Sequence, residues 1–110
     1  MAVTDGGGAM VLYEVTARVD RAIAEDFLAW LPGHVQRILA LPGFLGADMY
    51  EIVENPPDAT HLLMCVHYRL PDAAALDAYL LEHAARMRAE AAESFGDRVR
   101  ASRRVLRAFG

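Results

Sequence analysis

Apolar and polar positions along the chain repeat with two different periods. Between residues 10 and 19 they alternate, which is the pattern of a strand with one buried face. Three later segments are also predicted to be strands: residues 44–54, 60–70 and 98–107. After Asp20, and again after Pro71, apolar side chains recur every three or four residues, which predicts two amphipathic helices. The resulting order is β-α-β-β-α-β, an α+β, ferredoxin-like fold with a four-stranded antiparallel sheet.

Local signals set the expected ends of the helices. Asp20 is a candidate N-cap for the first helix, because its carboxylate can accept from the free amides of the first turn. Pro32 lies inside the apolar stripe, where it should cost about 3 kcal/mol, so we expect a kink or a short restart there. The first helix is expected to end at residues 41–43, and Gly96 to end the second. The core stripe of the second helix is predicted to contain Leu76, Tyr79, Leu80, His83 and Met87.

Two helices can cover one face of a four-stranded sheet, so the other face must meet water or a partner. In the third predicted strand one face is apolar and is expected to meet the helices, whereas the other contains His61, Leu63, Cys65, His67 and Arg69. Polar side chains are expected on the same open face of the other strands: Glu14, Thr16 and Arg18, then Asp48 and Tyr50 with Ile52, then Ser102 and Arg104. A face this mixed favours a homodimer that encloses a partly polar space.

Composition narrows the class of protein. The chain has 110 residues, 55% of them hydrophobic, and a net charge of −4, which argues against disorder and against a general nucleic-acid binder. The single cysteine, Cys65, excludes an internal disulfide and favours the reducing cytoplasm. No apolar run reaches the roughly 20 residues of a membrane span, so no membrane partner is expected. Residues 1–9 are predicted to be a flexible leader and residues 10–110 a single domain.

Several segments resemble known families. The run LPGFLG at residues 41–46, followed by Leu76, Tyr79, His83 and Met87, resembles the dimeric α/β-barrel superfamily, which includes antibiotic-biosynthesis and haem-degrading monooxygenases. Four further segments resemble a bacterial domain-of-unknown-function family, number 4286: residues 13–16, 27–31, 81–88 and 101–106. The resemblance extends from about Met10 to Arg107 and implies a ferredoxin-like dimer that forms an α/β barrel, with no established activity.

The resemblance to haem-degrading enzymes does not extend to their functional residues. Those enzymes use an Asn, a Trp and a haem-ligating His. Here the single asparagine, Asn55, lies in a proline-rich turn, and the single tryptophan, Trp30, lies on the core stripe of the first helix. We therefore predict no cofactor; glycine-rich phosphate loops and nucleotide fingerprints are also absent from the sequence.

Three chemical alternatives stay open on the predicted open face. Cys65 and His67 are close enough on one strand to share a metal ion, but His61 is too far away and no carboxylate is locally placed to complete the site, so no metal is predicted. Cys65 beside His67 could also form a nucleophile, although a small buried hydrophobe is the simpler interpretation. The last strand has five basic residues that would hold an anion, protect an edge, or pair with the acidic 48–58 region of a second copy: Arg98, Arg100, Arg103, Arg104 and Arg107.

The functional hypothesis from the sequence is a small homodimer that binds an anionic or aromatic ligand in a cavity at the open sheet face. The residues expected to line this cavity are Glu14, Tyr50, His67, Arg69 and Arg104. One alternative is a cofactor-independent enzyme of the monooxygenase or cyclase type, with His67 as proton shuttle and Arg69 or Arg104 stabilising an enolate. A purely structural dimer is the other.

Overall fold

The computed structural model describes residues 9–109. Its centre is one antiparallel sheet of four strands in the order β2-β3-β1-β4. The strands are β1 (Val11–Asp20), β2 (Gly46–Glu51), β3 (His61–Leu70) and β4 (Val99–Arg107). The helices are α1 (Ala24–Leu39), α2 (Ala73–Glu82) and α3 (Ala84–Phe95), with 3-10 turns η2 (Arg21–Ile23) and η3 (Gly96–Arg98). The predicted α+β, ferredoxin-like fold is confirmed. The leader predicted for residues 1–9 lies, apart from its last residue, outside the described residues.

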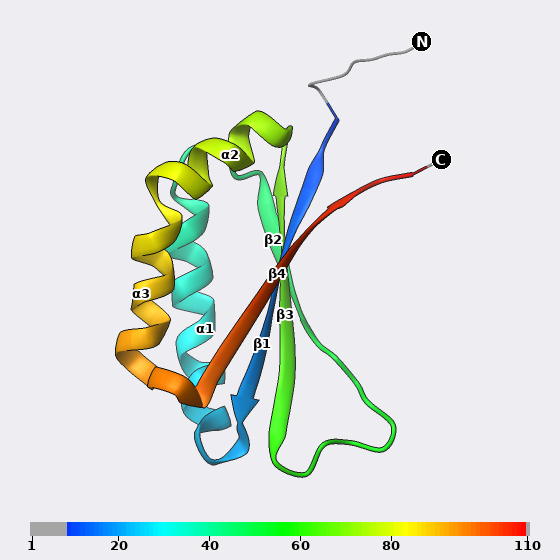
Figure 1. The fold of residues 1–110 in the computed structure, drawn as a ribbon, viewed down its shortest axis with the longest axis vertical. Coiled ribbons are helices and arrows are strands. Elements are labelled where there is room, and N and C mark those ends of the chain that lie inside the picture. The colour runs from blue at the N-terminus through cyan, green and yellow to red at the C-terminus, as the bar shows by residue number, and fades with distance from the viewer. Residues whose placement is uncertain (1–8, 110) are drawn as a thin grey trace.

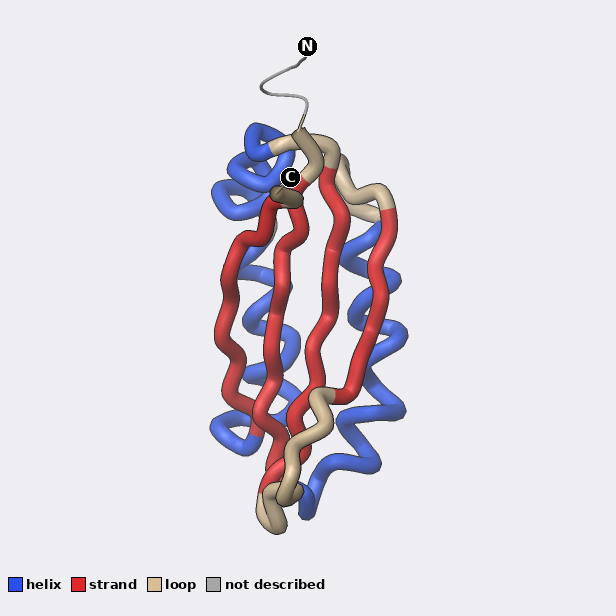
Figure 2. The backbone as a smooth tube through the Cα atoms, turned by 90° about the vertical axis from the view of Figure 1, so that its right-hand side faces the viewer, coloured by secondary structure: helices blue, strands red, loops and turns tan. Residues whose placement is uncertain are grey.

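All three helices lie on one face of the sheet, as the edge-on view shows (Figure 1). The opposite face presents all four strands with no helix in front of them (Figure 2). The core lies between the sheet and the helices, because the inward-facing residues of β1 and β3 meet the apolar stripes of the helices. Its most deeply buried large side chains are Val11, Val19, Tyr68 and Leu70. No helix among residues 9–109 is long and apolar enough to cross a membrane.

The first helix begins and continues for reasons visible in the sequence. The Asp20 carboxylate accepts from the backbone N–H of Ala22 at 2.9 Å, which confirms it as a cap, here of η2. Of the kink or short restart expected at Pro32, the restart does not occur, since α1 continues as one helix from Ala24 to Leu39 with Pro32 inside it. Four buried residues hold the helix to the core on both sides of the proline: Phe27, Leu31, Val35 and Ile38. Each contributes about 1.5–3 kcal/mol, which together outweighs the roughly 3 kcal/mol cost of proline.

The second predicted helix is divided in the structure. Asp72 caps α2 by accepting from the N–H of Ala75 at 2.9 Å, but α2 ends at Glu82 and α3 begins at Ala84. At the junction, His83 has φ −130°, outside the helical range. Figure 1 shows α2 crossing one end of the sheet while α3 lies beside α1. The second predicted helix is therefore two helices, α2 and α3. The prediction of Leu80 in the core is also wrong, since Leu80 is 38% exposed.

Candidate functional site

Strand register aligns the open-face residues in rows across the sheet. One row contains Asp48, His67, Glu14 and Arg104, each opposite the next on the neighbouring strand. The adjacent row contains Tyr50, Cys65, Thr16 and Ser102 in the same way. Directly opposed residues of antiparallel strands point to the same face, so the faces predicted for β2 and β4 are confirmed.

Glu14 is the centre of a charged cluster on this face. Its Oε1 accepts from Nε of Arg104 at 2.5 Å, and its Oε2 lies 2.7 Å from Nε2 of His67. The whole residue is 9% exposed. The hydrogen bond from Arg104, and after it the one from His67, lowers the pKa of the Glu14 carboxyl below its ordinary value, against the opposing effect of burial. Glu14 is therefore a carboxylate at neutral pH, with both oxygens engaged.

A second ion pair joins β3 to β2. Nη1 of Arg69 donates to Oδ2 of Asp48. The Arg69 side chain passes over Gly46, where an added Cβ would overlap its guanidinium. Gly46 therefore leaves the space that lets Arg69 reach Asp48.

Four of the five residues predicted to line an open-face cavity share one hollow of about 660 Å³: Glu14, Tyr50, His67 and Arg104. Arg69 does not line it and pairs with Asp48 instead. The hollow is also lined by Thr16, Ile52, Cys65, Ser102 and Arg103. Since Glu14 already neutralises Arg104, and Asp48 neutralises Arg69, neither guanidinium is unpaired for an incoming anion.

The structure corrects the sequence-based argument about metal ligands. No carboxylate was expected beside Cys65 and His67, yet Glu14 lies opposite His67, and the ligand atoms of Glu14, Cys65 and His67 all lie within 4.8 Å of one another. His61 does not join the group, as expected from its spacing; its Nδ1 lies 2.8 Å from Oγ1 of Thr60. Glu14 is 53 residues from His67 in the chain. Over such a sequence separation, no spacing pattern in the sequence could have predicted that Glu14 lies beside His67.

The position of Cys65 argues against a nucleophile. Although it lies on the open face, Cys65 is buried. Burial, and after it the charge of Glu14, raises the pKa of its thiol above the ordinary value. The thiolate, which is the nucleophilic form, is therefore disfavoured.

A second cavity, not predicted from the sequence, lies between the sheet and the helices. Its volume is about 80 Å³, which is enough for several water molecules. Most of its walls are apolar or aromatic and come from β1, β3 and the three helices, including Tyr13, Phe27, Trp30, Met64, Tyr68, Tyr79 and Met87. Small residues leave the space open: Ala17, Ala91 and Ala101. Small residues at these inward-facing positions are a sequence signal from which the cavity could have been predicted, although it was not.

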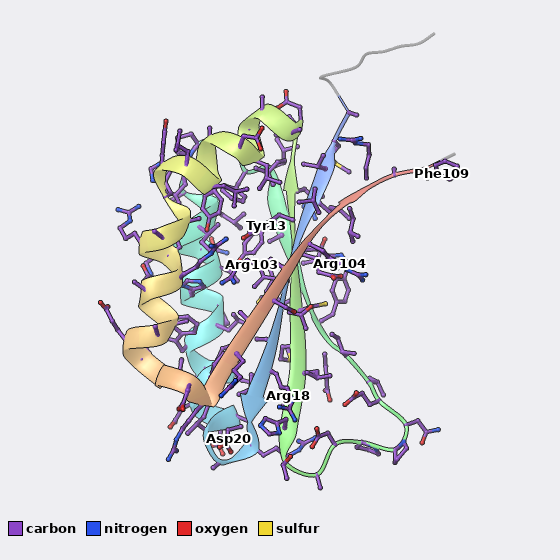
Figure 3. The ribbon with its side chains drawn as sticks, in the orientation of Figure 1. Tyr13, Arg18, Asp20, Arg103, Arg104 and Phe109 are labelled. Carbon is purple, nitrogen blue, oxygen red and sulfur yellow. The ribbon has the colours of Figure 1, made fainter. Side chains whose placement is uncertain are left out.

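Polar groups also line this helix-side cavity. The Tyr13 hydroxyl accepts from Nη2 of Arg88 at 3.2 Å, and Arg103 lines the cavity from β4. Figure 3 shows Tyr13 and Arg103 on the helix side of the strands, whereas Arg104 is on the opposite side. Among residues 9–109, neither Arg88 nor Arg103 forms an ion pair with a carboxylate.

His34 lines the same cavity and has an orienting partner. Its Nδ1 lies 2.9 Å from Oε1 of Glu90, which also accepts from Nε of Arg37 at 3.0 Å. The ring stacks on Trp30 with 4.4 Å between ring centroids. Burial lowers the pKa of His34 below its ordinary value, more than Glu90 raises it. His34 is therefore a neutral imidazole at neutral pH, and its Nδ1–H donates to Glu90.

These features define a ferredoxin-like α+β protein with a mainly apolar cavity between its sheet and its helices. The chain belongs to the family described as "Domain of unknown function (DUF4286)", whose model matches residues 10–109. This confirms the family resemblance found in the sequence. No curated protein sequence matches the chain.

Solved structures share the fold at low sequence identity. A conserved protein of unknown function from Bacteroides thetaiotaomicron, described as a possible oxidoreductase, is 14% identical with a TM-score of 0.65, over 92% of this chain and 99% of its own. A putative antibiotic biosynthesis monooxygenase from Nitrosomonas europaea is 15% identical with a TM-score of 0.64, over 98% and 95%. SnoaB, a cofactor-independent oxygenase from Streptomyces nogalater, is 13% identical with a TM-score of 0.62, over 89% and 92%. At 13–15% sequence identity, these comparisons show that the fold is shared and nothing more.

Proposed function

We propose that the protein binds a small aromatic anion in the helix-side cavity. The observation that carries this proposal is an aromatic-walled cavity with two arginines, Arg88 and Arg103, that have no carboxylate partner among the described residues. Pockets that are mainly apolar, with a few convergent polar groups, are typical ligand sites. The aromatic walls would hold a ring, and a guanidinium would hold a carboxylate or phenolate.

This places the ligand on the other side of the sheet from the site expected from the sequence. On the open face, Arg104 and Arg69 are neutralised by Glu14 and Asp48, so an anion would have to displace a bound carboxylate. On the helix side no such competition exists for Arg88, whose partner is the neutral Tyr13 hydroxyl. The cost of breaking an ion pair therefore favours the helix-side cavity.

Titration with benzoate, followed by NMR of the backbone amides, tests the proposal. Ala91 lines the cavity, so Ala91→Leu fills it and should weaken benzoate binding at least about 10-fold, since a buried group of that size is worth about 1.5–3 kcal/mol. The matched control is Ala92→Leu, on the exposed side of α3, which should bind as the wild type does. Equal binding by all three proteins would contradict the proposal.

The open face is proposed to pair with the open face of a second copy. It presents Tyr50, 49% exposed, and Ile52, 37% exposed, beside the charged cluster. Its two edges have complementary charge: β4 is rich in arginine, and the acidic residues of the 48–58 region lie at the β2 edge. A two-fold axis parallel to the strands would place the β2 edge of one copy over the β4 edge of the other. The cytoplasm is the proposed location, because Cys65 is a free thiol.

A cofactor-independent oxygenase is the second candidate, favoured by His34. A neutral imidazole held by Glu90 at an apolar cavity can accept a proton from a bound phenol, and Arg88 or Arg103 would stabilise the resulting anion. The fold is shared with SnoaB, whose name describes such chemistry. Oxygen uptake with a hydroxyaromatic substrate separates the two candidates. The enzyme hypothesis requires uptake that His34→Gln abolishes while benzoate binding persists; a binding protein shows no uptake.

A further inference from the structure

Three metal-binding side chains meet on the open face of the sheet, on the side opposite the proposed ligand cavity. Glu14 on β1 and Cys65 and His67 on β3 have ligand atoms within 4.8 Å of one another. Glu14 and Cys65 are buried, and His67 is half-buried. All three project from the two central strands of the sheet, so their backbones are held in place by pairing on both sides.

We propose that Glu14, Cys65 and His67 bind one zinc ion. Thiolate, imidazole and carboxylate are the three ligand types that proteins use for zinc, at about 2.0–2.3 Å from the ion. Tetrahedral ligands at these distances lie about 3.5 Å apart. A movement of each ligand atom by about 1 Å, through rotation of its side chain, would therefore bring all three to bonding distance of one ion. Three protein ligands leave a fourth position open, and here it faces the hollow lined by Tyr50 and Ser102.

The hydrogen bonds of Glu14 fit this role. Its Oε2, which now contacts Nε2 of His67 at 2.7 Å, would turn with that nitrogen toward the ion. Its Oε1 would keep the hydrogen bond from Arg104, which orients the carboxylate as partners of metal ligands commonly do. The Arg104 side chain is 69% exposed, so water screens its charge from the ion.

The charges of the ligands also favour a divalent ion. On binding, Cys65 loses its thiol proton to solvent, and the proton on Nε2 of His67, which now points to Glu14, leaves that nitrogen for Nδ1 or solvent, so that the Nε2 lone pair can bind the ion. The thiolate and the Glu14 carboxylate together then supply two negative charges against the two positive charges of zinc. The same two anions close together are unfavourable without the ion. This explains in simple terms why the Cys65 thiol should ionise only when metal is present.

The experiment uses untagged, full-length protein, because a polyhistidine tag binds zinc itself. Zinc is titrated by calorimetry, and Co²⁺ replaces it as a spectroscopic probe, since a cobalt–thiolate bond gives a charge-transfer absorption that oxygen and nitrogen ligands do not give. We expect one ion per chain and a thiolate band. Cys65→Ser should abolish the band, and His67→Gln should weaken zinc binding at least about 100-fold, because loss of an orienting partner alone costs about 10–100-fold.

His61→Gln is the matched control. His61 lies on the same strand and the same face as His67 but outside the group, so this variant should bind zinc as the wild type does. Circular dichroism shows whether each variant is folded. The proposal is overturned if the wild type binds no zinc at micromolar concentration, if the cobalt complex lacks a thiolate band, or if His61→Gln weakens binding as much as His67→Gln does.

Discussion

Glu14 and His67 lie directly opposite each other on β1 and β3, and Oε2 of Glu14 is 2.7 Å from Nε2 of His67. With Arg104 on the other side of Glu14, this relationship makes a nearly buried carboxylate the link between three of the four strands. The stability of the sheet should therefore depend on the charge of one residue.

Glu14→Gln tests this dependence. The pKa of Glu14 is lowered in the folded protein, so the unfolded chain takes up the proton first as the pH falls. The stability that Glu14 contributes is complete well above its ordinary pKa of 4.5 and is lost as the pH falls through the lower, folded-state value. Glu14→Gln should reduce the free energy of unfolding at pH 7 by about 1–3 kcal/mol and lack this acid-dependent loss. Urea unfolding at fixed protein concentration, repeated across pH, measures the free energy of unfolding at pH 7 and its loss in acid.

The control for this variant is Glu25→Gln, on the exposed side of α1. Glu25 forms no ion pair within the described part of the chain, so its variant should keep the wild-type pH profile. If Glu14→Gln has the same acid profile as the wild type, the Glu14 cluster does not control acid stability.

Tyr50→Arg should separate the proposed dimer. Tyr50 lies on the edge strand β2, which in the proposed dimer faces the arginine-rich β4 edge of the other copy, so a new guanidinium there would be buried against like charges. Sedimentation velocity should show a dimer for the wild type and a monomer for the variant. Leu81→Arg, on the exposed surface of α2, should remain dimeric. A monomeric wild type would refute the open-face interface.

His34 should titrate below its ordinary pKa of 6.5 in the folded protein, because burial disfavours its charged form. Glu90→Gln removes the carboxylate that favours the imidazolium, so it should lower the pKa of His34 further. The NMR chemical shifts of the His34 imidazole C–H protons, recorded from pH 4 to 8, would follow the titration. Glu93→Gln, on the exposed side of α3, should leave His34 unchanged. A rise in the His34 pKa in Glu90→Gln would contradict the orientation assigned here.

Two glycines should respond oppositely to alanine. Gly43 has φ +95°, and an added Cβ would lie 3.2 Å from Cβ of Ala75, so Gly43→Ala should lower the free energy of unfolding by at least about 1 kcal/mol. Gly33 lies inside α1, where its new Cβ would meet the movable end of Arg37 at 3.3 Å. Gly33→Ala should therefore raise the free energy of unfolding by about 0.5–1 kcal/mol. Thermal unfolding of both variants checks the signs; equal shifts would argue against a backbone cause.

The sequence by itself determined the order of the elements and the face on which most side chains lie. These properties follow from short-range periodicity: alternation placed His67 and Cys65 on one face of β3, and Asp20 was placed as a cap by its neighbours alone. Steric and hydrogen-bonding rules between residues a few positions apart decide such features. These features can therefore be predicted from the sequence without knowledge of any tertiary contact.

The tertiary structure alone decided which side chains meet. Glu14 reaches His67 and Arg104 across 53 and 90 residues of chain, through a strand register that no local pattern encodes. The break at His83 and the helix-side cavity depend likewise on how α2 and α3 pack against the sheet. The charged cluster, the metal ligands and the cavity are therefore products of long-range packing.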